Sequence, residues 1–415
     1  MKQVSAFSLP AVIVVCIIMS ILVLFVISLS DLNQLYYSYY CRIKKQNEDI
    51  NSLFLLYRTD STFLKEVAEK GSYQLYDDQP ATSVTMEVQP WGLYEFVKIR
   101  ALDDSFSSVR LFGQAIDCDY EAALWVCNNG KPLVLGETAQ IMGNSYFPMG
   151  LIQYSSISKH DPLDNKVKTR YINPSGTDLP RIVAANKYLW ERYYMKKANG
   201  IPPIGIDNQT IRCSFWQDEV HFFMPPERLD ISVSGQVILH GDRVRLSVGD
   251  TLNDAILIAR SVTVEEGFTG CLQILASDTV VLQQNTHLYY PSGIYLRGGR
   301  CGAYLQMDKH STLDGYAVVT DSLKRKVEPD KMKMPNVLQH PEAIFNGLLY
   351  VDGIADLRGI CYGGTYLKEC QCTTDDKNPT HNMLCTAKIY RNAHLGFPIF
   401  FEQSQYSRRE MKTLY

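Results

Sequence analysis

The sequence lacks an excess of charge of either sign. Lysine and arginine number 41 and aspartate and glutamate 44, which gives a net charge of -3. A nucleic-acid-binding protein usually carries a basic patch or stripe, and no basic stripe with interleaved aromatic residues occurs here. Charged residues make up 20% and hydrophobic residues 46% of the chain, as in ordinary globular proteins. We therefore expect a folded protein that has no nucleic-acid partner.

One long apolar stretch, Leu9–Leu29, contains no charged residue. A helix of this length, with a rise of about 1.5 Å per residue, extends for roughly 30 Å, which is the thickness of the hydrocarbon core of a membrane. A cleaved secretory signal has a shorter apolar region, of about 7 to 15 residues. We predict a single-pass membrane protein that keeps this helix as a transmembrane anchor in contact with membrane lipid.

Charge does not fix the side of the membrane on which the body lies. Arg42, Lys44 and Lys45 follow the span, and the positive-inside rule would place them in the cytoplasm. All three lie 13 or more positions beyond Leu29, which weakens their influence on orientation. The basic residues therefore do not decide on which side of the membrane the body lies.

The N-terminus has a short basic leader, then Ala6 and Phe7, and directly afterwards the apolar helix. This order resembles type IV prepilins and the minor pseudopilins of type II secretion systems. The resemblance implies leader cleavage between Ala6 and Phe7, and a body outside the cytoplasm. The chain departs from the family in having Ala6 where glycine is usual, and Ala11 where the mature helix usually has glutamate.

The helix is expected to continue beyond the membrane, through 31–57. Ile50, Leu53, Phe54 and Tyr57 recur at steps of three and four residues, which places them on one face of a helix. An extended helix that leaves the membrane and packs on a head domain is the arrangement found in pilins. It is also the arrangement of a plain stalk.

An internal repeat with a period of 18 residues occupies 237–290. It aligns apolar residues in the columns Ile238, Ile256 and Ile274; Leu239, Leu257 and Leu275; Val244, Val262 and Val280; and Leu246, Val264 and Leu282. Gly249, Gly267 and Asn285 share a further column and suit corners that need a positive φ. Alternating apolar residues with a fixed period predict stacked strands. The predicted fold class is therefore mainly β: a β-helix of about 18 residues per coil, with the long transmembrane helix and a few accessory helices.

A second run, 347–368, splits into groups of six that begin at Gly347, Gly353 and Gly359. Because eighteen is three sixes, each coil is expected to be triangular. The apolar, glycine-punctuated segment 133–157 belongs either to the same solenoid or to an earlier coil. In the period of its repeat and its pattern of apolar residues, the body resembles the bactofilins, β-helical proteins that polymerise through the ends of their coils.

The predicted domains are a transmembrane and extended helix at 1–57, a β-rich region at 58–200, the β-helix at 201–368 and a C-terminal region at 369–415. A helix is predicted at 181–198, where Ile182, Leu189 and Tyr193 share a face and Gly200 follows the end. Since an open coil edge invites pairing with another chain, this helix is a candidate cap.

No residue constellation indicates a reaction. His240 and His287 lie on or beside the predicted strands, and β-helical acyltransferases use a histidine base, but a single histidine is usually structural. Polysaccharide lyases and hydrolases of β-helical fold need paired carboxylates, or a carboxylate with arginine or lysine. The charged column Asp242, Arg260 and Asp278 fits a solvated turn better. We assign no catalytic and no cofactor-binding residues, and expect a protein that is not an enzyme.

The 11 cysteines favour disulfides if the body lies outside the cytoplasm. Candidates are Cys118 with Cys127, and the group from Cys361 to Cys385; buried free thiols are the alternative. The set Cys370, Cys372, His381 and Cys385 does not have the spacing of a known zinc motif, and the acidic residues of 117–121 do not complete a calcium loop. We assign no metal site.

These observations predict a structural or assembly component of a bacterial envelope apparatus, in the form of a subunit similar to minor pilins. Its partners would be other copies of itself or other subunits of the apparatus. Two alternatives stay open: a polysaccharide-active β-helix enzyme, and a membrane-tethered scaffold that polymerises.

Overall fold

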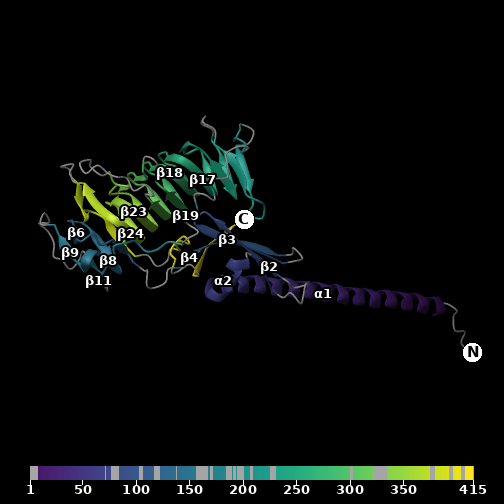
Figure 1. Ribbon diagram of the computed structural model, residues 1–415. Coiled ribbons are helices and arrows are strands. Elements are labelled where there is room, and N and C mark those ends of the chain that lie inside the picture. The colour runs from purple at the N-terminus through teal and green to yellow at the C-terminus, as the bar shows by residue number, and fades with distance from the viewer. Residues whose placement is uncertain are drawn as a thin grey trace, which may run out of the picture. The chain divides into compact units, whose positions relative to one another are not determined.

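The fold is taken from a computed structural model of the chain (Figure 1). The structure describes residues 8–414 except 71, 76–83, 102–105, 116–121, 137, 156–166, 169–171, 184–188, 190–192, 194–200, 206–208, 225–229, 300–301, 321–333, 374–378, 392–395 and 403–406. The chain divides into two compact units, which are described separately. Unit 1 comprises 1–56, 72–87 and 99–108, and unit 2 comprises 57–71, 88–98 and 109–415.

Unit 1 is dominated by the helix α1, Ser8–Thr59, which continues by three residues into unit 2. At about 1.5 Å per residue its 52 residues extend for roughly 78 Å. Every side chain from Leu9 to Arg42 is exposed, and burial begins only at Gln46. The predicted stripe of Ile50, Leu53, Phe54 and Tyr57 is buried, which confirms that one face of the helix is apolar beyond the stretch 9–29.

A five-stranded antiparallel sheet follows, after the short helix α2, Ser61–Lys70, which Asp60 caps through its side chain. The strand order is β1-β2-β3-β4-β28. Its strands are β1 Ser72–Leu75, β2 Val84–Trp91, β3 Tyr94–Ala101, β4 Ser107–Gln114 and β28 Arg408–Leu414. The last strand pairs with β4, so all of 115–407 is inserted between two adjacent strands.

Most of this insertion forms one sheet of twenty strands, in which all the pairings but that of β25 are parallel. The strands are β5 Leu124–Val126, β7 Gln140–Met142, β8 Ser145–Phe147, β10 Val167–Lys168, β11 Ile172–Pro174, β12 Thr210–Cys213, β13 Val220–Phe223, β14 Ser232–Gly235, β15 Val237–His240, β16 Arg243–Leu246, β17 Thr251–Val264, β18 Thr269–Leu282, β19 His287–Leu296, β20 Tyr304–Met307, β21 Thr312–Thr320, β22 Val337–Gln339, β23 Ile344–Asp356, β24 Ile360–Thr373, β25 Pro379–His381 and β27 Lys388–Tyr390. A smaller sheet contains β6 Leu133–Leu135, β9 Ile152–Tyr154 and β26 Met383–Leu384. The predicted glycine-punctuated segment 133–157 thus supplies strands to both sheets.

The strand content confirms a mainly β body behind a long N-terminal helix, with 53% of residues in strands and 20% in helices. Within the twenty-stranded sheet, β18, β19, β21, β23, β22 and β20 are joined in a closed, barrel-like ring of parallel pairings. The ring closes because β18 and β23 are long: the first part of β18 pairs with β19 and its last part with β20. Side chains of the core cluster line its interior.

The register confirms part of the predicted column pattern. Val244, Val262 and Val280 are paired in succession, and so are Leu246, Val264 and Leu282. The column of Ile238 and Ile256 does not continue to Ile274, because Ile256 pairs with Gln273. Register shifts between Asn253 and Ala255 and between Ala259 and Ser261 displace this part of β18 by one residue. The prediction for Ile274 was therefore wrong, and so was that for Leu275, which pairs with Ile258.

The predicted corner residues are also only partly correct. Gly267 and Asn285 have positive φ values of 78° and 57°, whereas Gly249 does not adopt a positive φ. The six-residue grouping does not describe the pairing either, since Gly347 pairs with Gly315 on one side and Gly363 on the other. These three glycines have φ values between 127° and 144° and stack at one corner of successive strands.

The predicted helix at 181–198 does not begin at Arg181. Residues 181–183 are extended and pair with the segment around Phe401, through a bridge at Ile182 and a hydrogen bond from the Val183 amide to the Phe400 carbonyl. Leu189 and Tyr193 are helical and buried, as predicted. The rest of the predicted helix lies outside the described residues.

Candidate functional site

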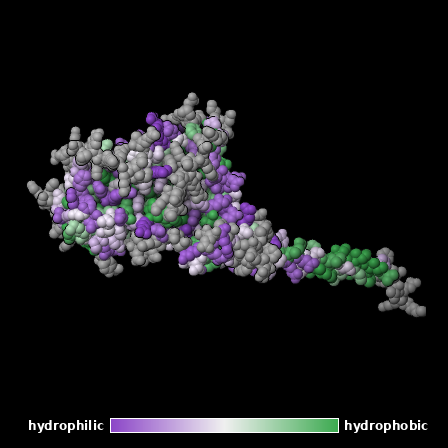
Figure 2. Space-filling view, in the orientation of Figure 1, coloured by the Kyte–Doolittle hydropathy of each residue, from purple (hydrophilic) through white to green (hydrophobic). Residues whose placement is uncertain are grey.

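The outer part of α1 is the most conspicuous functional surface. It is long and apolar enough to cross a membrane, and its side chains are exposed throughout, from Leu9 at 70% to Leu29 at 45%. Figure 2 shows hydrophobic side chains gathered on this part of the helix. So large an exposed apolar surface is typical of a site that a membrane or another protein covers, and a helix suits lipid because its backbone groups are paired within it.

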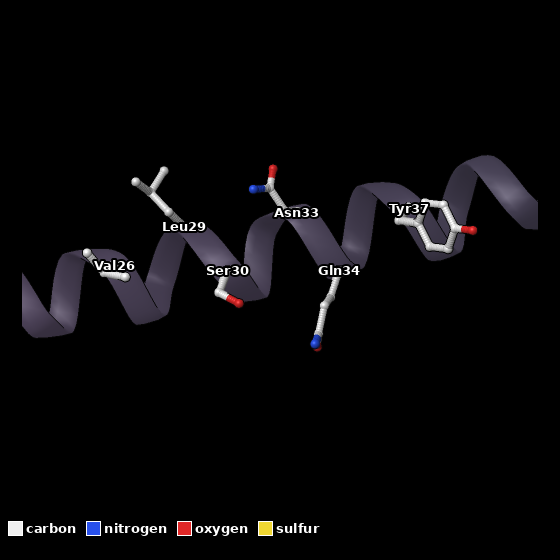
Figure 3. A pocket seen from close by; sticks show the side chains of 6 residues that line it. All are labelled: Val26, Leu29, Ser30, Asn33, Gln34 and Tyr37. Atoms are coloured by element: carbon white, nitrogen blue, oxygen red, sulfur yellow. The ribbon is translucent and has the colours of Figure 1, made fainter.

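Just beyond the apolar stretch 9–29, polar side chains appear on the surface of α1. Figure 3 shows Val26 and Leu29 followed by Ser30, Asn33 and Gln34, with Tyr37 one turn later. All of these side chains come from the one helix, so the hollow between them is open. Tyr37 is 71% exposed, and three further exposed tyrosines lie beside it, at positions 36, 39 and 40. Tyrosines with an apolar ring and a polar hydroxyl are enriched where a span meets the membrane surface.

The predicted leader-cleavage residues, Ala6 and Phe7, lie outside the described residues. The first described residue, Ser8, is already the first residue of α1. The cleavage thus stays a prediction.

Inside unit 2, a partly buried carboxylate joins the end of α1 to the antiparallel sheet. Glu95 on β3 accepts hydrogen bonds from the Tyr57 hydroxyl and the Arg408 guanidinium group. Arg408 is 9% exposed, and burial raises the pKa of Tyr57 well above its ordinary value. The cluster is internally satisfied, with a donor on each side of the carboxylate, and it therefore stabilises the sheet.

Gln273 on β18 connects the parallel sheet to the β2–β3 turn. Its side-chain oxygen accepts hydrogen bonds from the Leu93 amide at 3.1 Å and the Tyr316 hydroxyl at 2.8 Å, and its nitrogen donates to the Trp91 carbonyl at 2.9 Å. The residue is 4% exposed, so each of these bonds forms where water does not compete. Gly92 completes the turn with φ of 62°.

Gln114 makes a second junction at the other end of the insertion. Its side-chain oxygen accepts hydrogen bonds from the amides of Phe400 and Phe401, each at 3.0 Å, and its nitrogen donates to the Phe401 carbonyl at 2.7 Å. It is fully buried. No sequence pattern drew attention to Gln114 or Gln273, because a single glutamine carries no signal for a long-range contact.

The two histidines considered as bases are in different settings. His240 is 7% exposed, and its Nε2 lies 2.9 Å from Nδ1 of His221, whose Nε2 in turn lies 3.3 Å from Glu219. Burial, reinforced by the charge that His221 can carry, lowers the pKa of His240 to about 4. His240 is thus buried against a second histidine, and its lowered pKa keeps the ring neutral near neutral pH.

His287 lies on the outer side of the parallel sheet and is half-buried. Its Nε2 is 2.8 Å from the Asp314 carboxylate, and its ring lies 4.0 Å from that of Tyr289. Asp314 also accepts a hydrogen bond from the Asn346 amide. The sequence predicted that His287 lies on a strand but not that these partners, from three different strands, surround it.

The cysteines form one disulfide among the described residues, between Cys372 and Cys385, within the predicted group. These two thiols are therefore not available to the zinc set considered above, and no group of three or more metal-ligating side chains occurs in the described part of the chain. Cys127 is free and buried. Its suggested partner Cys118, and the acidic residues of 117–121, lie outside the described residues.

The charged column predicted on the outer turn is partly confirmed. Arg260 forms an ion pair with Asp242 at 2.9 Å, and both side chains are largely exposed. Such a surface pair is worth at most about 1 kcal/mol and fits a solvated turn. Asp278 accepts a hydrogen bond from its neighbour Ser277 and has no ion pair with Arg260 among the contacts of the described residues.

Comparison with known proteins identifies no relative of this chain. No protein-family model, no curated protein and no solved structure matches it. The functional conclusions below therefore rest on the chain's own residues and geometry.

Proposed function

We propose that the chain is a membrane-anchored, non-enzymatic structural or assembly subunit of a bacterial envelope apparatus, built like a minor pilin. The observation that carries this proposal is the continuity of α1. Residues 9–42 of this one helix are all exposed, and its later face, with Ile50, Leu53 and Phe54, is buried. One element thus joins a membrane-spanning surface to a folded head without a flexible linker.

The antiparallel sheet that follows α1 supports the likeness to pilins. The strands β1 to β4 form a meander, and the final strand of the chain, β28, completes its edge. The inserted residues 115–407 return to the same strand pair from which they leave. In this arrangement the chain leaves the antiparallel sheet after β4, forms the insertion and returns to the same sheet at β28.

We further propose that the twenty-stranded sheet is a β-helix with coils of about 18 residues. Val244 pairs with Val262, and Val262 pairs with Val280, each pair one repeat apart in the sequence. Long strands such as β17 pair with different neighbours along their length, as expected where a strand turns a corner of a coil. In this proposal, the six strands of the closed ring belong to neighbouring coils of the β-helix.

The body is proposed to lie outside the cytoplasm. The disulfide between Cys372 and Cys385 supports this placement, because disulfides persist in oxidising compartments and are rare in the cytosol. The likeness of the N-terminus to prepilins supports the same side. The free thiols of Cys361 and Cys370 are buried, where they are protected from oxidants and from exchange.

N-terminal mass spectrometry of the full chain, purified from membranes of cells with and without a prepilin peptidase, tests the proposal. We expect a mature start at Phe7 that requires the peptidase. Replacing Ala6 with a bulky residue, Ala6→Leu, is expected to block the cut, while Ser5→Ala leaves it intact. An intact Met1 in every case would overturn the pilin-like proposal and favour a plain membrane-tethered scaffold.

A further inference from the structure

Seven outward-facing side chains form a continuous ladder across the parallel sheet. The ladder consists of His287, Tyr289, Asp314, Asn346, Tyr362, Tyr390 and Gln140, from strands β19, β21, β23, β24, β27 and β7. We call this set the polar ladder. At roughly 4.8 Å between neighbouring strands, it extends for roughly 24 Å across the sheet.

Contacts hold successive members of the polar ladder together. His287 lies against Tyr289 and 2.8 Å from Asp314, which accepts a hydrogen bond from Asn346. Asn346 is the register partner of Tyr362. At the other end the rings of Tyr362 and Tyr390 stack with centroids 5.3 Å apart, and the Tyr390 hydroxyl donates to Gln140 at 2.9 Å.

The inward-facing side chains of the same strands form a tightly buried row beneath the polar ladder. Each strand contributes an alternate residue that points inward and is at most 1% exposed: Leu288, Leu313, Phe345, Cys361, Ile389 and Ile141. The ladder side chains themselves are partly exposed, and Tyr289 is 47% exposed. Polar groups are therefore displayed on a fixed frame, and a ligand would not have to order them.

The chemistry of the polar ladder narrows the class of ligand. It offers hydroxyl, amide, imidazole and carboxylate groups, and its one carboxylate, Asp314, already faces His287. The seven ladder side chains include no lysine or arginine. Lys388, the register partner of Gln140, adds one basic group to this face, and a single basic group does not suit nucleic acid or another polyanion. The central strands β21, β23, β24 and β27 each have a neighbour on both sides, so no free backbone edge is available for an added peptide strand.

We infer that the polar ladder binds a neutral, linear polysaccharide that lies across the strands. Sugar hydroxyl groups both donate and accept hydrogen bonds, as the ladder groups do, and tyrosine combines an apolar ring with a hydroxyl at a partly wet surface. Hydrolysis is not part of the inference, because a glycosidase needs two carboxyl groups on its substrate and the ladder has one. This inference goes beyond the proposed anchoring role.

Affinity electrophoresis of the full-length protein in detergent tests the inference. The probes are soluble neutral polymers (β-glucan, mannan and galactan) and, for comparison, acidic ones (alginate and polygalacturonate). We expect retardation by at least one neutral polymer, with binding about tenfold weaker in Asn346→Ala, the loss that follows from one or two hydrogen bonds. Tyr304→Ala is the matched control, since Tyr304 lies on β20, outside the polar ladder, and is also half-buried.

Tyr390→Phe gives a second, milder variant, which removes only the hydroxyl that contacts Gln140. Thermal unfolding of each variant verifies that it is folded. The inference is overturned if none of the neutral polymers retards the wild-type protein, if folded Asn346→Ala and Tyr390→Phe bind as tightly as wild type, or if only acidic polymers bind and salt abolishes that binding. Leader cleavage and membrane insertion are unaffected by these variants, so this failure is distinguishable from failure of the proposed function.

Discussion

The ammonium group of Lys412 lies 2.8 Å from both carboxylate oxygens of Asp254. Lys412 belongs to the last strand of the antiparallel sheet, and Asp254 lies on β17 of the parallel sheet with φ of 62°. The backbone carbonyl of Asp254 also accepts a hydrogen bond from the Trp91 indole at 3.0 Å. Together with Gln273 and Gln114, this pair fixes the insertion to the strands that carry it.

Replacing Lys412 with methionine is expected to lower the free energy of unfolding by about 1 to 3 kcal/mol, because the half-buried Asp254 carboxylate loses its partner. Methionine keeps the apolar part of the lysine side chain, so the change removes mainly the charge. Urea unfolding followed by tryptophan fluorescence measures the change. Lys368→Met is the matched control: Lys368 contacts Asp352 at 2.6 Å on the open surface. Its loss should cost less than about 1 kcal/mol, and equal effects of the two variants would contradict the assigned role of Lys412.

Gly347 has no room for a side chain. Its φ is 136°, and a Cβ atom there would lie 1.7 Å from the Gly315 carbonyl oxygen. We expect Gly347→Ala to destabilise the protein by more than about 4 kcal/mol or to prevent folding. Gly176→Ala is the control, because the nearest atom to its added Cβ would be 3.9 Å away. Yield and thermal unfolding distinguish the two, and a stable Gly347→Ala protein would show the stacked corner to be wrong.

Residues that repeat at a fixed spacing predicted the buried face of α1 and part of the strand pairing. The apolar steps from Ile50 to Tyr57 and the column from Val244 to Val280 were confirmed, because each position repeats the environment of the one before. The column of Ile238 failed where register shifts change the spacing between paired residues of β17 and β18. Shifts of this kind depend on backbone packing, which residue spacing does not record.

Contacts between distant segments had no sequence signal. Gln114 pairs with Arg408 across the whole insertion, and Asn129 contacts Asn382. The segment with β5 and β7 precedes the repeat in the chain but pairs with β24 and β27, which follow it. The polar ladder was missed for this reason, since its members come from strands at unequal spacing along the chain.

The burial of the free cysteines and the disulfide together predict which thiols react with an alkylating reagent. Burial raises the pKa of Cys361 and Cys370 to about 12, so both are expected to resist alkylation in the native protein at neutral pH. Cys41 is exposed on α1 and should react at once. Mass spectrometry under non-reducing conditions should also recover the peptide link between Cys372 and Cys385. Rapid native alkylation of Cys372 would contradict the bond.

The bond is also expected to contribute to stability. It links residues separated by 13 positions in the sequence, and the loop entropy for a loop of this size gives about 3 kcal/mol. The double variant Cys372→Ser with Cys385→Ser should therefore unfold at a lower temperature than wild type. Reductant should lower the wild-type unfolding temperature towards that of the variant and leave the variant unchanged. If reductant lowers both equally, the effect has another origin.

His240 predicts how stability depends on pH. Its folded pKa, about 4, lies below its ordinary value of 6.5, so between these values the unfolded chain binds more protons. The contribution of His240 is therefore fully present above about pH 6.5 and is lost as the pH falls towards 4. Thermal unfolding of His240→Gln measured from pH 7 to pH 4 should show a shallower decline than wild type.

The matched control for this prediction is His310→Gln. His310 is 56% exposed and contacts Glu342 at 3.0 Å on the surface, so it is not desolvated as His240 is. His310→Gln therefore controls for the loss of a histidine side chain at the surface. His221→Gln separates the two causes of the low pKa, since it removes the neighbouring imidazole but leaves His240 buried. If the slope is the same in wild type and His240→Gln, the pH dependence comes from other groups and the buried histidine pair is not its source.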